Sequence, residues 1–206
     1  MFIRTLLNLF FPPVCPVCSK RIGERGLCPE CFSRLDFVRD NTPDRASAVV
    51  YDETSRKLLM MLKYGGRTDL ALLMARLMHG AGKDVLSDAD LLTGVPLHWK
   101  RMLSRKYNQA AVLATELSKL SGVPVNPELL KRVKATPKQG TRKERLENVR
   151  GAFSFNPAFP VRGKRIVLID DVLTTGATLR SCAGVLLKNG AKEVRFLTFA
   201  RAREER

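Results

Sequence analysis

The sequence predicts an α/β protein with a mostly parallel sheet, helices on both faces of that sheet, and a small cysteine-containing module at the N-terminus. Short apolar segments typical of strands alternate with longer segments of helical spacing, an order that favours parallel strands joined by helices. Four of the five cysteines fall within the first 31 residues. We therefore expect two units, a cysteine module at residues 1–40 and a main domain at residues 46–206.

The main domain is predicted to begin with a strand and two helices. A polar, proline-containing linker at 39–45 leads into residues 46–51, which have strand character. In residues 55–63 apolar side chains recur at helical spacing, and a pair of glycines ends that helix. A second apolar helix is expected at 69–78, followed by a strand at 91–97.

The second half of the main domain continues the alternation of helices and strands. We expect a helix from about 108 to 120 and a charged helix at 142–149. Residues 166–169 are all apolar, as in a parallel strand that is covered on both faces. A helix that reaches about residue 188, a stop at Gly190 and a final strand at 194–199 complete the predicted fold.

The cysteine module is predicted to bind Zn²⁺. Two Cys-x-x-Cys pairs lie close enough in sequence to form one tetrahedral thiolate site, with the ligands Cys15, Cys18, Cys28 and Cys31. The short spacer favours a small knuckle or treble-clef-like finger, with a helix at 28–35, that folds on metal binding. Two disulfides and a thioredoxin-like redox pair are the alternatives. Cys182, outside the module, is expected to be a buried core thiol.

Basic residues outnumber acidic residues by a wide margin. There are 36 Lys and Arg against 20 Asp and Glu, a net charge of +16, which indicates an anionic partner such as a polyphosphate, a nucleic acid or an acidic membrane surface. No apolar run is long enough to span a bilayer. Residues 1–14 resemble a secretion signal but lack a small-residue cleavage site. We therefore expect a cytoplasmic protein, with peripheral contact at the inner face of the membrane as the alternative.

The most informative segment follows the apolar run at 166–169. Two adjacent acids come first, Asp170 and Asp171, at the carboxyl end of the predicted strand, where open α/β sheets bind ligands. A hydroxyl-rich turn then opens a helix, where backbone N–H groups suit a phosphate; its residues are Thr174, Thr175, Gly176, Ala177 and Thr178. The acid pair could bind two neighbouring hydroxyls, and the turn could bind a phosphate. A phosphorylated ribose carries both groups, so this segment indicates such a ligand. A plain strand–turn–helix with an Asx turn is the alternative.

Two basic segments accompany this motif. Residues 94–109 contain a basic loop without acids, and residues 131–150 contain eight basic residues against two acidic ones. Either could neutralise a pyrophosphate or contact a nucleic acid, although a solvated surface is the alternative for residues 141–150. His98 and Trp99 could stack on a base, but a packed Trp is the simpler interpretation.

The segment at 166–178 resembles the 5-phosphoribosyl-1-pyrophosphate (PRPP) motif of type I phosphoribosyltransferases. The resemblance implies that the acid pair, Asp170 and Asp171, holds the ribose hydroxyls and that the loop holds the 5′-phosphate. It also implies Mg²⁺, bound together with PRPP. Purine-type members of that family usually place an acid where this chain has Thr174, so the resemblance leaves the catalytic base, and catalysis itself, open.

The whole chain is similar to the ComF family of competence proteins. The shared pattern comprises the four cysteines, the segments Lys63-Tyr64-Gly65-Gly66, 96–109 and 136–153, and the PRPP-type loop. Lys106 stands where the family usually has Gly. The resemblance implies a type I phosphoribosyltransferase-like fold, Zn²⁺, and a part in DNA uptake. It suggests pyrophosphate or nucleic-acid contacts at Lys63, Lys100, Arg101, Arg105, Arg142 and Arg145.

Three functions remain open at this point. The first is a DNA-uptake or natural-transformation factor that binds PRPP or a related ribose phosphate, contacts single-stranded DNA and works with proteins of the uptake machinery. The second is an active phosphoribosyltransferase with a small-molecule acceptor. The third is a non-catalytic scaffold that acts through its zinc module.

Overall fold

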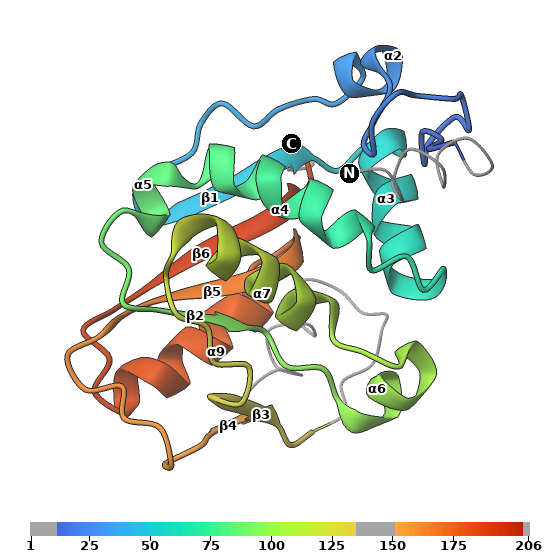
Figure 1. Cartoon of the computed structure of the whole chain (residues 1–206). Coiled ribbons are helices and arrows are strands. Elements are labelled where there is room, and N and C mark those ends of the chain that lie inside the picture. The colour runs from blue at the N-terminus through green and yellow to red at the C-terminus, as the bar shows by residue number, and fades with distance from the viewer. Residues whose placement is uncertain (1–11, 135–150, 204–206) are drawn as a thin grey trace.

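The protein is built around one four-stranded parallel sheet, as the sequence predicts. The computed structural model describes residues 12–134 and 151–203, apart from the side chains of Lys100 and Arg101. The strand order is β1-β6-β5-β2, with the bounds β1 (Arg45–Val50), β2 (Leu91–Gly94), β5 (Arg165–Leu173) and β6 (Glu193–Arg201) (Figure 1). The two central strands, β5 and β6, pair along their whole length, with Ile169 opposite Leu197.

Helices cover both faces of this sheet. One face carries α3 (Glu53–Tyr64), α4 (Leu70–Ala81), the short α5 (Lys83–Leu86) and α7 (Gln109–Ser121). The opposite face carries α9 (Ala177–Lys188) (Figure 1). The segments predicted as helices at 55–63, 69–78 and 108–120 are therefore confirmed, with ends shifted by a few residues.

The central strand β5 shows why its sequence is apolar without interruption. Val167 and Ile169 pack into the core on the α4–α7 face, whereas Ile166 and Leu168 pack into the core under α9. All four are fully buried. Because successive side chains of a strand point to opposite faces, a strand covered on both sides needs apolar residues at every position.

The main domain differs from the predictions in three elements after β2. The segment after β2, expected to be a basic loop, contains a helix, α6 (Trp99–Arg105). Strand β5 does not end before the acid pair but continues through it to Leu173. A small antiparallel hairpin, formed by β3 (Leu130–Arg132) and β4 (Phe153–Phe155), was not predicted. The predicted charged helix at 142–149 lies outside the described residues.

The cysteine module precedes β1 and contains one short helix. This helix, α2 (Pro29–Ser33), is shorter than the predicted 28–35, and Cys28 is its N-cap. The chain then passes through isolated bridges, such as that between Phe37 and Val49, before β1 begins.

A close approach at Gly94 fixes the position of α7 over the end of β2. A Cβ atom at Gly94 would lie 2.6 Å from the backbone N of Ala111 and 2.7 Å from the backbone C of Ala110. The backbone atoms of a packed helix can move away from an added Cβ atom only at a large cost in free energy. We expect Gly94→Ala to lower the free energy of unfolding by about 1–3 kcal/mol, the usual cost of overpacking. Urea denaturation measures this change in the free energy of unfolding.

Gly80→Ala is the matched control for this substitution. Gly80 lies within α4, and a Cβ there would meet nothing within 4 Å. Since Ala is a better helix former than Gly, this variant should be as stable as the wild type or up to ~1 kcal/mol more stable. Equal stability of the Gly94→Ala variant would contradict the close packing of α7 on β2.

Candidate functional site

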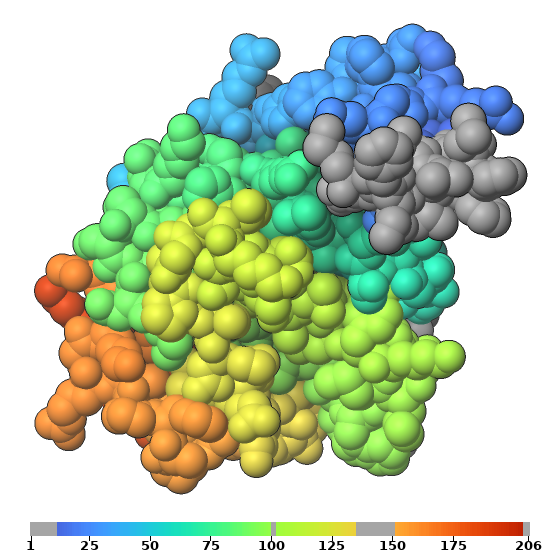
Figure 2. Space-filling model, in the orientation of Figure 1, coloured from blue at the N-terminus to red at the C-terminus, as the bar shows by residue number. Residues whose placement is uncertain are grey.

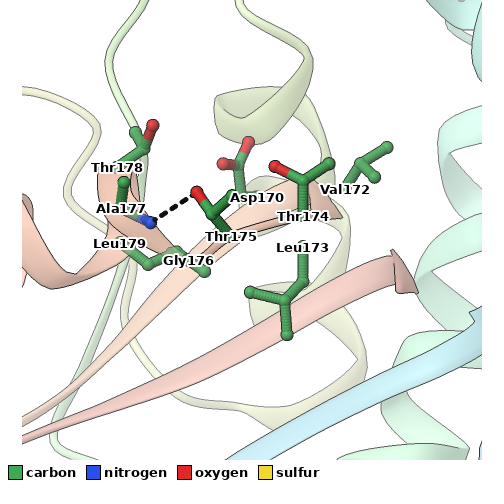
Figure 3. Close-up of a pocket in the computed structure, with 9 residues that line it drawn as sticks. All are labelled: Asp170, Val172, Leu173, Thr174, Thr175, Gly176, Ala177, Thr178 and Leu179. Atoms are coloured by element: carbon green, nitrogen blue, oxygen red, sulfur yellow. Dashed lines mark hydrogen bonds between the residues drawn. The ribbon is translucent and has the colours of Figure 1, made fainter. Parts of the chain in front are cut away.

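The phosphate-loop sequence forms the wall of a pocket at the carboxyl end of β5. The pocket encloses about 230 Å³ of space, part of it open to solvent, and is lined by Asp170, Val172, Leu173, Thr174, Thr175, Gly176, Ala177, Thr178 and Leu179. In Figure 3 the carboxylate of Asp170 and the hydroxyls of Thr174 and Thr175 project to the same side, whereas Leu173 points away. The chain therefore brings one predicted carboxylate and the whole predicted loop to one cavity.

The loop leaves backbone donors of α9 available for an anion. Gly176, the N-cap of α9, has a φ of +69°, in the left-handed region that favours glycine, and has no side chain with which to cap the helix. The N–H of Ala177 makes only a long contact, 3.4 Å, with Oγ1 of Thr175. The first N–H groups of a helix have no partner within the helix, so an anion in the pocket can accept from them.

The two acids of the motif have different surroundings. Asp170 is half-buried, and its Oδ1 accepts from the backbone N–H of Asp171 at 2.8 Å. Burial and the charge of Asp171 raise the pKa of Asp170 to about 7, although the positive charges of Lys63 and Arg132 act in the opposite direction. Asp170 is therefore only partly ionised at neutral pH.

Asp171 forms an ion pair with Lys63, at the last turn of α3. The Lys63 Nζ lies 2.6 Å from Oδ2 of Asp171, and the two side chains are only 19% and 16% exposed. Asp171 does not line the pocket that Asp170 lines. The pair nevertheless joins the Lys-Tyr-Gly-Gly segment to the acid pair, two motifs that are more than a hundred residues apart in sequence.

A second set of contacts joins the end of α3 to the end of α6 and to the residues that follow it. Tyr107 donates its hydroxyl hydrogen to the carbonyl of Leu62. Arg105 donates to the Tyr64 hydroxyl at 3.2 Å and to Oε1 of Gln109 at 2.9 Å. Three of the sequence motifs therefore meet at the carboxyl edge of the sheet (Figure 1).

Of the remaining predicted basic contacts, Arg105 is the one whose side chain the structure describes, and it does not line the pocket. Arg105 contacts Tyr64 and Gln109 rather than the loop. Lys100 and Arg101 lie in α6, and their side chains are outside the described part of the structure. Arg142 and Arg145 lie outside the described residues.

Two arginines near the site were not singled out from the sequence. Arg180 lies one turn into α9 and donates to the carbonyl of Thr175, so it covers one side of the loop. Its position four residues after Gly176, on the same helical face, is the signal that could have identified it. Arg132 lowers the pKa of Asp170 from β3, a role that depends on the unpredicted hairpin.

The simpler interpretation of the aromatic pair after β2, in which Trp99 is packed in the core, is wrong. His98 is 7% exposed, whereas Trp99 is 58% exposed, so Trp99 is not a packed core residue. Cys182 behaves as predicted: it lies on the buried face of α9, and burial raises the pKa of its thiol.

The four N-terminal cysteines form one cluster. Their sulfur atoms all lie within 4.8 Å of one another, with Sγ of Cys18 3.6 Å from Sγ of Cys28. A bridge between Val14 and Arg21 closes the turn that holds the first pair, and the second pair begins α2. A tetrahedral Zn²⁺ site with Zn–S bonds of 2.3 Å has sulfur atoms ~3.8 Å apart, so this donor set fits Zn²⁺. The cysteines are free thiols, which does not support the alternative of two disulfides.

Two domain families match the chain, and they define its class. Residues 108–206 match the phosphoribosyl transferase domain, and residues 6–54 match the double zinc ribbon domain. The protein is thus a phosphoribosyltransferase-like α/β domain preceded by a zinc ribbon. The short spacer between the cysteine pairs had instead suggested a knuckle or treble-clef-like finger.

Curated relatives identify the family. The chain is 31% identical to Competence protein F of Haemophilus influenzae, over 92% of this chain and 90% of that protein. It is 31% identical to the DNA utilization protein YhgH of Escherichia coli K12, over 88% and 87%. It is 26% identical to Competence protein ComFC of Bacillus subtilis, over 91% and 77%. The chain therefore belongs to the ComF/YhgH family of competence and DNA-utilization proteins. Among the described residues, no helix is both long enough and apolar enough to cross a bilayer.

Proposed function

We propose that this protein binds PRPP or a related ribose 5-phosphate in the pocket at the end of β5. One observation carries the proposal: the carboxylate of Asp170 and the uncapped N-terminus of α9 face the same small cavity. A carboxylate accepts hydrogen bonds from vicinal hydroxyls, and helix N–H groups donate to a phosphate. A phosphorylated ribose presents both groups on one small molecule.

Each part of the loop has its own role in this proposal. The backbone of residues 174–178 holds the 5′-phosphate, with the hydroxyls of Thr174, Thr175 and Thr178 as additional donors. Asp170 orients the ribose through its hydroxyls. Lys63 neutralises Asp171, so that the acid pair does not repel the phosphate through two full negative charges. Mg²⁺ would enter with PRPP on its pyrophosphate and offset that charge.

A thermal-shift series tests the ligand. PRPP with Mg²⁺ and ribose 5-phosphate should both raise the melting temperature, and ligand at about 100 times its Kd adds about 2.7 kcal/mol of stability. Ribose without phosphate should shift it much less, since the helix N-terminus then has no anion to bind. If neither phosphorylated sugar raises the melting temperature, the scaffold function is favoured instead.

We further propose that the protein acts in DNA uptake or utilization by contacting single-stranded DNA. The names of its relatives refer to competence and DNA utilization, and the net charge of +16 favours a polyanion. The candidates for this contact are Arg105, whose side chain the structure describes, and Lys100, Arg101, Arg142 and Arg145.

Whether the protein also turns over PRPP is tested separately. Release of pyrophosphate in the presence of an acceptor would establish that activity.

Fluorescence anisotropy with a short single strand tests the DNA contact. Affinity should fall steeply between low and physiological salt, because each phosphate contact releases a counterion. The Asp170→Asn/Asp171→Asn variant should bind the strand as the wild type does, since the contact depends on Lys and Arg. Binding that is insensitive to salt, or absent at low salt, would contradict the proposed contact.

The four cysteines are proposed to hold one structural Zn²⁺. Three of the four cysteines are buried, and four protein thiolates would leave no coordination position open for a catalytic water. The ion would join the turn at 14–21 to α2, a segment too short to have an apolar core of its own.

A further inference from the structure

Tyr64 is an exposed aromatic residue in a fixed position. It ends α3, and its side chain is 58% exposed. The guanidinium carbon of Arg105 lies 5.2 Å from the centre of the Tyr64 ring, within range of a cation–π interaction. The same guanidinium donates to the Tyr64 hydroxyl at 3.2 Å.

The surroundings hold this pair in place. Arg105 also donates to Oε1 of Gln109, which is buried at the start of α7. The Tyr107 hydroxyl donates a hydrogen bond to the carbonyl of Leu62, two residues before Tyr64. The ring is therefore ordered before any ligand arrives, although it remains largely exposed. An ordered ring loses little conformational entropy when a flat partner stacks on it.

The pair lies beside the proposed ribose-phosphate site. Lys63, the neighbour of Tyr64 in the chain, forms the ion pair with Asp171 at 2.6 Å. The end of α3 and the helix α6 lie on the same side of the molecule, at the carboxyl edge of the sheet (Figure 1). The surface of this region, where α3, α6 and α7 adjoin, is visible in Figure 2.

We propose that Tyr64, backed by Arg105, is a stacking platform for a nucleobase of single-stranded DNA. This rests on the proposed contact with single strands and gives that contact an aromatic component as well as an electrostatic one. A ring stacks on any base, and an adjacent guanidinium adds a charge for the strand's phosphate. His98 is too buried to offer a face for stacking.

A comparison of DNA strands with and without bases separates the contribution of stacking to affinity from that of charge. The affinities of a short thymidine oligonucleotide and of an abasic strand with the same number of phosphates are compared at one low salt concentration. The wild type should bind the thymidine strand roughly tenfold more tightly, as expected from stacking of a single base. Tyr64→Leu should remove this preference and leave the affinity for the abasic strand unchanged. Tyr64→Phe, which keeps the ring, should retain it.

Tyr51→Leu is the matched control, because Tyr51 is 38% exposed and precedes α3. Tyr64 is the last of the twelve residues of α3, a helix about 18 Å long, and Tyr51 lies before its first residue. This variant should keep the preference. Trp99→Leu tests a second exposed aromatic residue, at the start of α6, and loss of the preference there alone would assign stacking to Trp99 and overturn the proposal for Tyr64.

The remaining outcomes are also decisive. If the wild type binds both strands equally, the platform is refuted while the DNA contact stands. If Tyr64→Leu weakens binding of both strands by the same factor, Tyr64 only clamps α3 to Arg105. Should Tyr64→Leu fail to fold, a wild-type titration with a 2-aminopurine strand replaces it, and unquenched base fluorescence in the complex would refute stacking. If the wild type binds neither strand, the DNA contact itself fails.

Discussion

Asp170→Asn is expected to raise the melting temperature of the ligand-free protein at about pH 8 and to abolish its stabilisation by PRPP. Burial and the charge of Asp171 raise the pKa of Asp170 to about 7 in the folded protein. In the unfolded chain an aspartate has a pKa of about 3.9. An acid with a raised pKa in the folded state contributes most to stability below pH 4, and this contribution is lost as the pH rises to about 7.

The size of this effect follows from the pKa difference. Each unit is 1.36 kcal/mol, so the ionised carboxylate costs at most ~4 kcal/mol at pH 8, and partial exposure reduces this to about 2 kcal/mol. Asparagine, which is neutral at every pH, avoids that cost but accepts less strongly from ribose hydroxyls. Thermal melts of the two proteins at pH 5 and pH 8, with and without PRPP and Mg²⁺, measure both effects. The stability gain should be larger at pH 8 than at pH 5, where only about one unit of the pKa difference has taken effect.

Two neighbouring substitutions serve as controls. Asp171→Asn should destabilise the protein, because it leaves the mostly buried Lys63 without its ion-pair partner. Asp84→Asn should change neither stability nor PRPP binding, since Asp84 is an exposed residue of α5, far from the carboxyl edge of the sheet. An Asp170→Asn variant that still responds fully to PRPP would show that this carboxylate does not hold the sugar.

The second large effect concerns the zinc module. Cys28→Ser should lower the zinc content from about one ion per chain to near zero and leave the N-terminal module open to proteolysis. Cys28 is buried, lies 3.6 Å from Cys18 and caps α2, so its loss removes both a ligand and the start of the helix. Elemental analysis and limited proteolysis with mass spectrometry measure the two consequences.

The fifth cysteine provides the control for this experiment. Cys182→Ala should keep its zinc, because Cys182 lies on the buried face of α9 and takes no part in the cluster. Its stability should fall through loss of packing alone. Full zinc content in Cys28→Ser, or sensitivity of the wild-type module to a reductant rather than to a chelator, would favour disulfides over a metal site.

Local sequence was sufficient for the central strand and for the loop. The apolar run at 166–169 and the glycine at 176 each reflect a local requirement, burial on both faces in one case and a left-handed turn in the other. The helix α6 was not predicted, because its run of basic residues was interpreted as a sign of a loop. Its residues Lys, Arg, Met and Leu are in fact good helix formers.

The contacts across the site could not be predicted, because they depend on the tertiary fold. Lys63 and Asp171 come from α3 and β5, and no local signal pairs them. The hairpin that carries Arg132 joins two three-residue strands about twenty residues apart, too short to show a clear alternation. Tyr64 looked like part of a motif in the sequence, and only the structure shows that it is exposed and held by Arg105.

The most direct test of the central claim is an NMR titration of ¹⁵N-labelled protein with ribose 5-phosphate. If the pocket holds the sugar phosphate, the largest amide shifts will fall on residues 174–178 and on Asp170 and Asp171, and the cysteine module will not respond. Shifts that spread over the basic surface and leave the loop unchanged would show that the phosphate binds elsewhere, and the proposed site would be wrong.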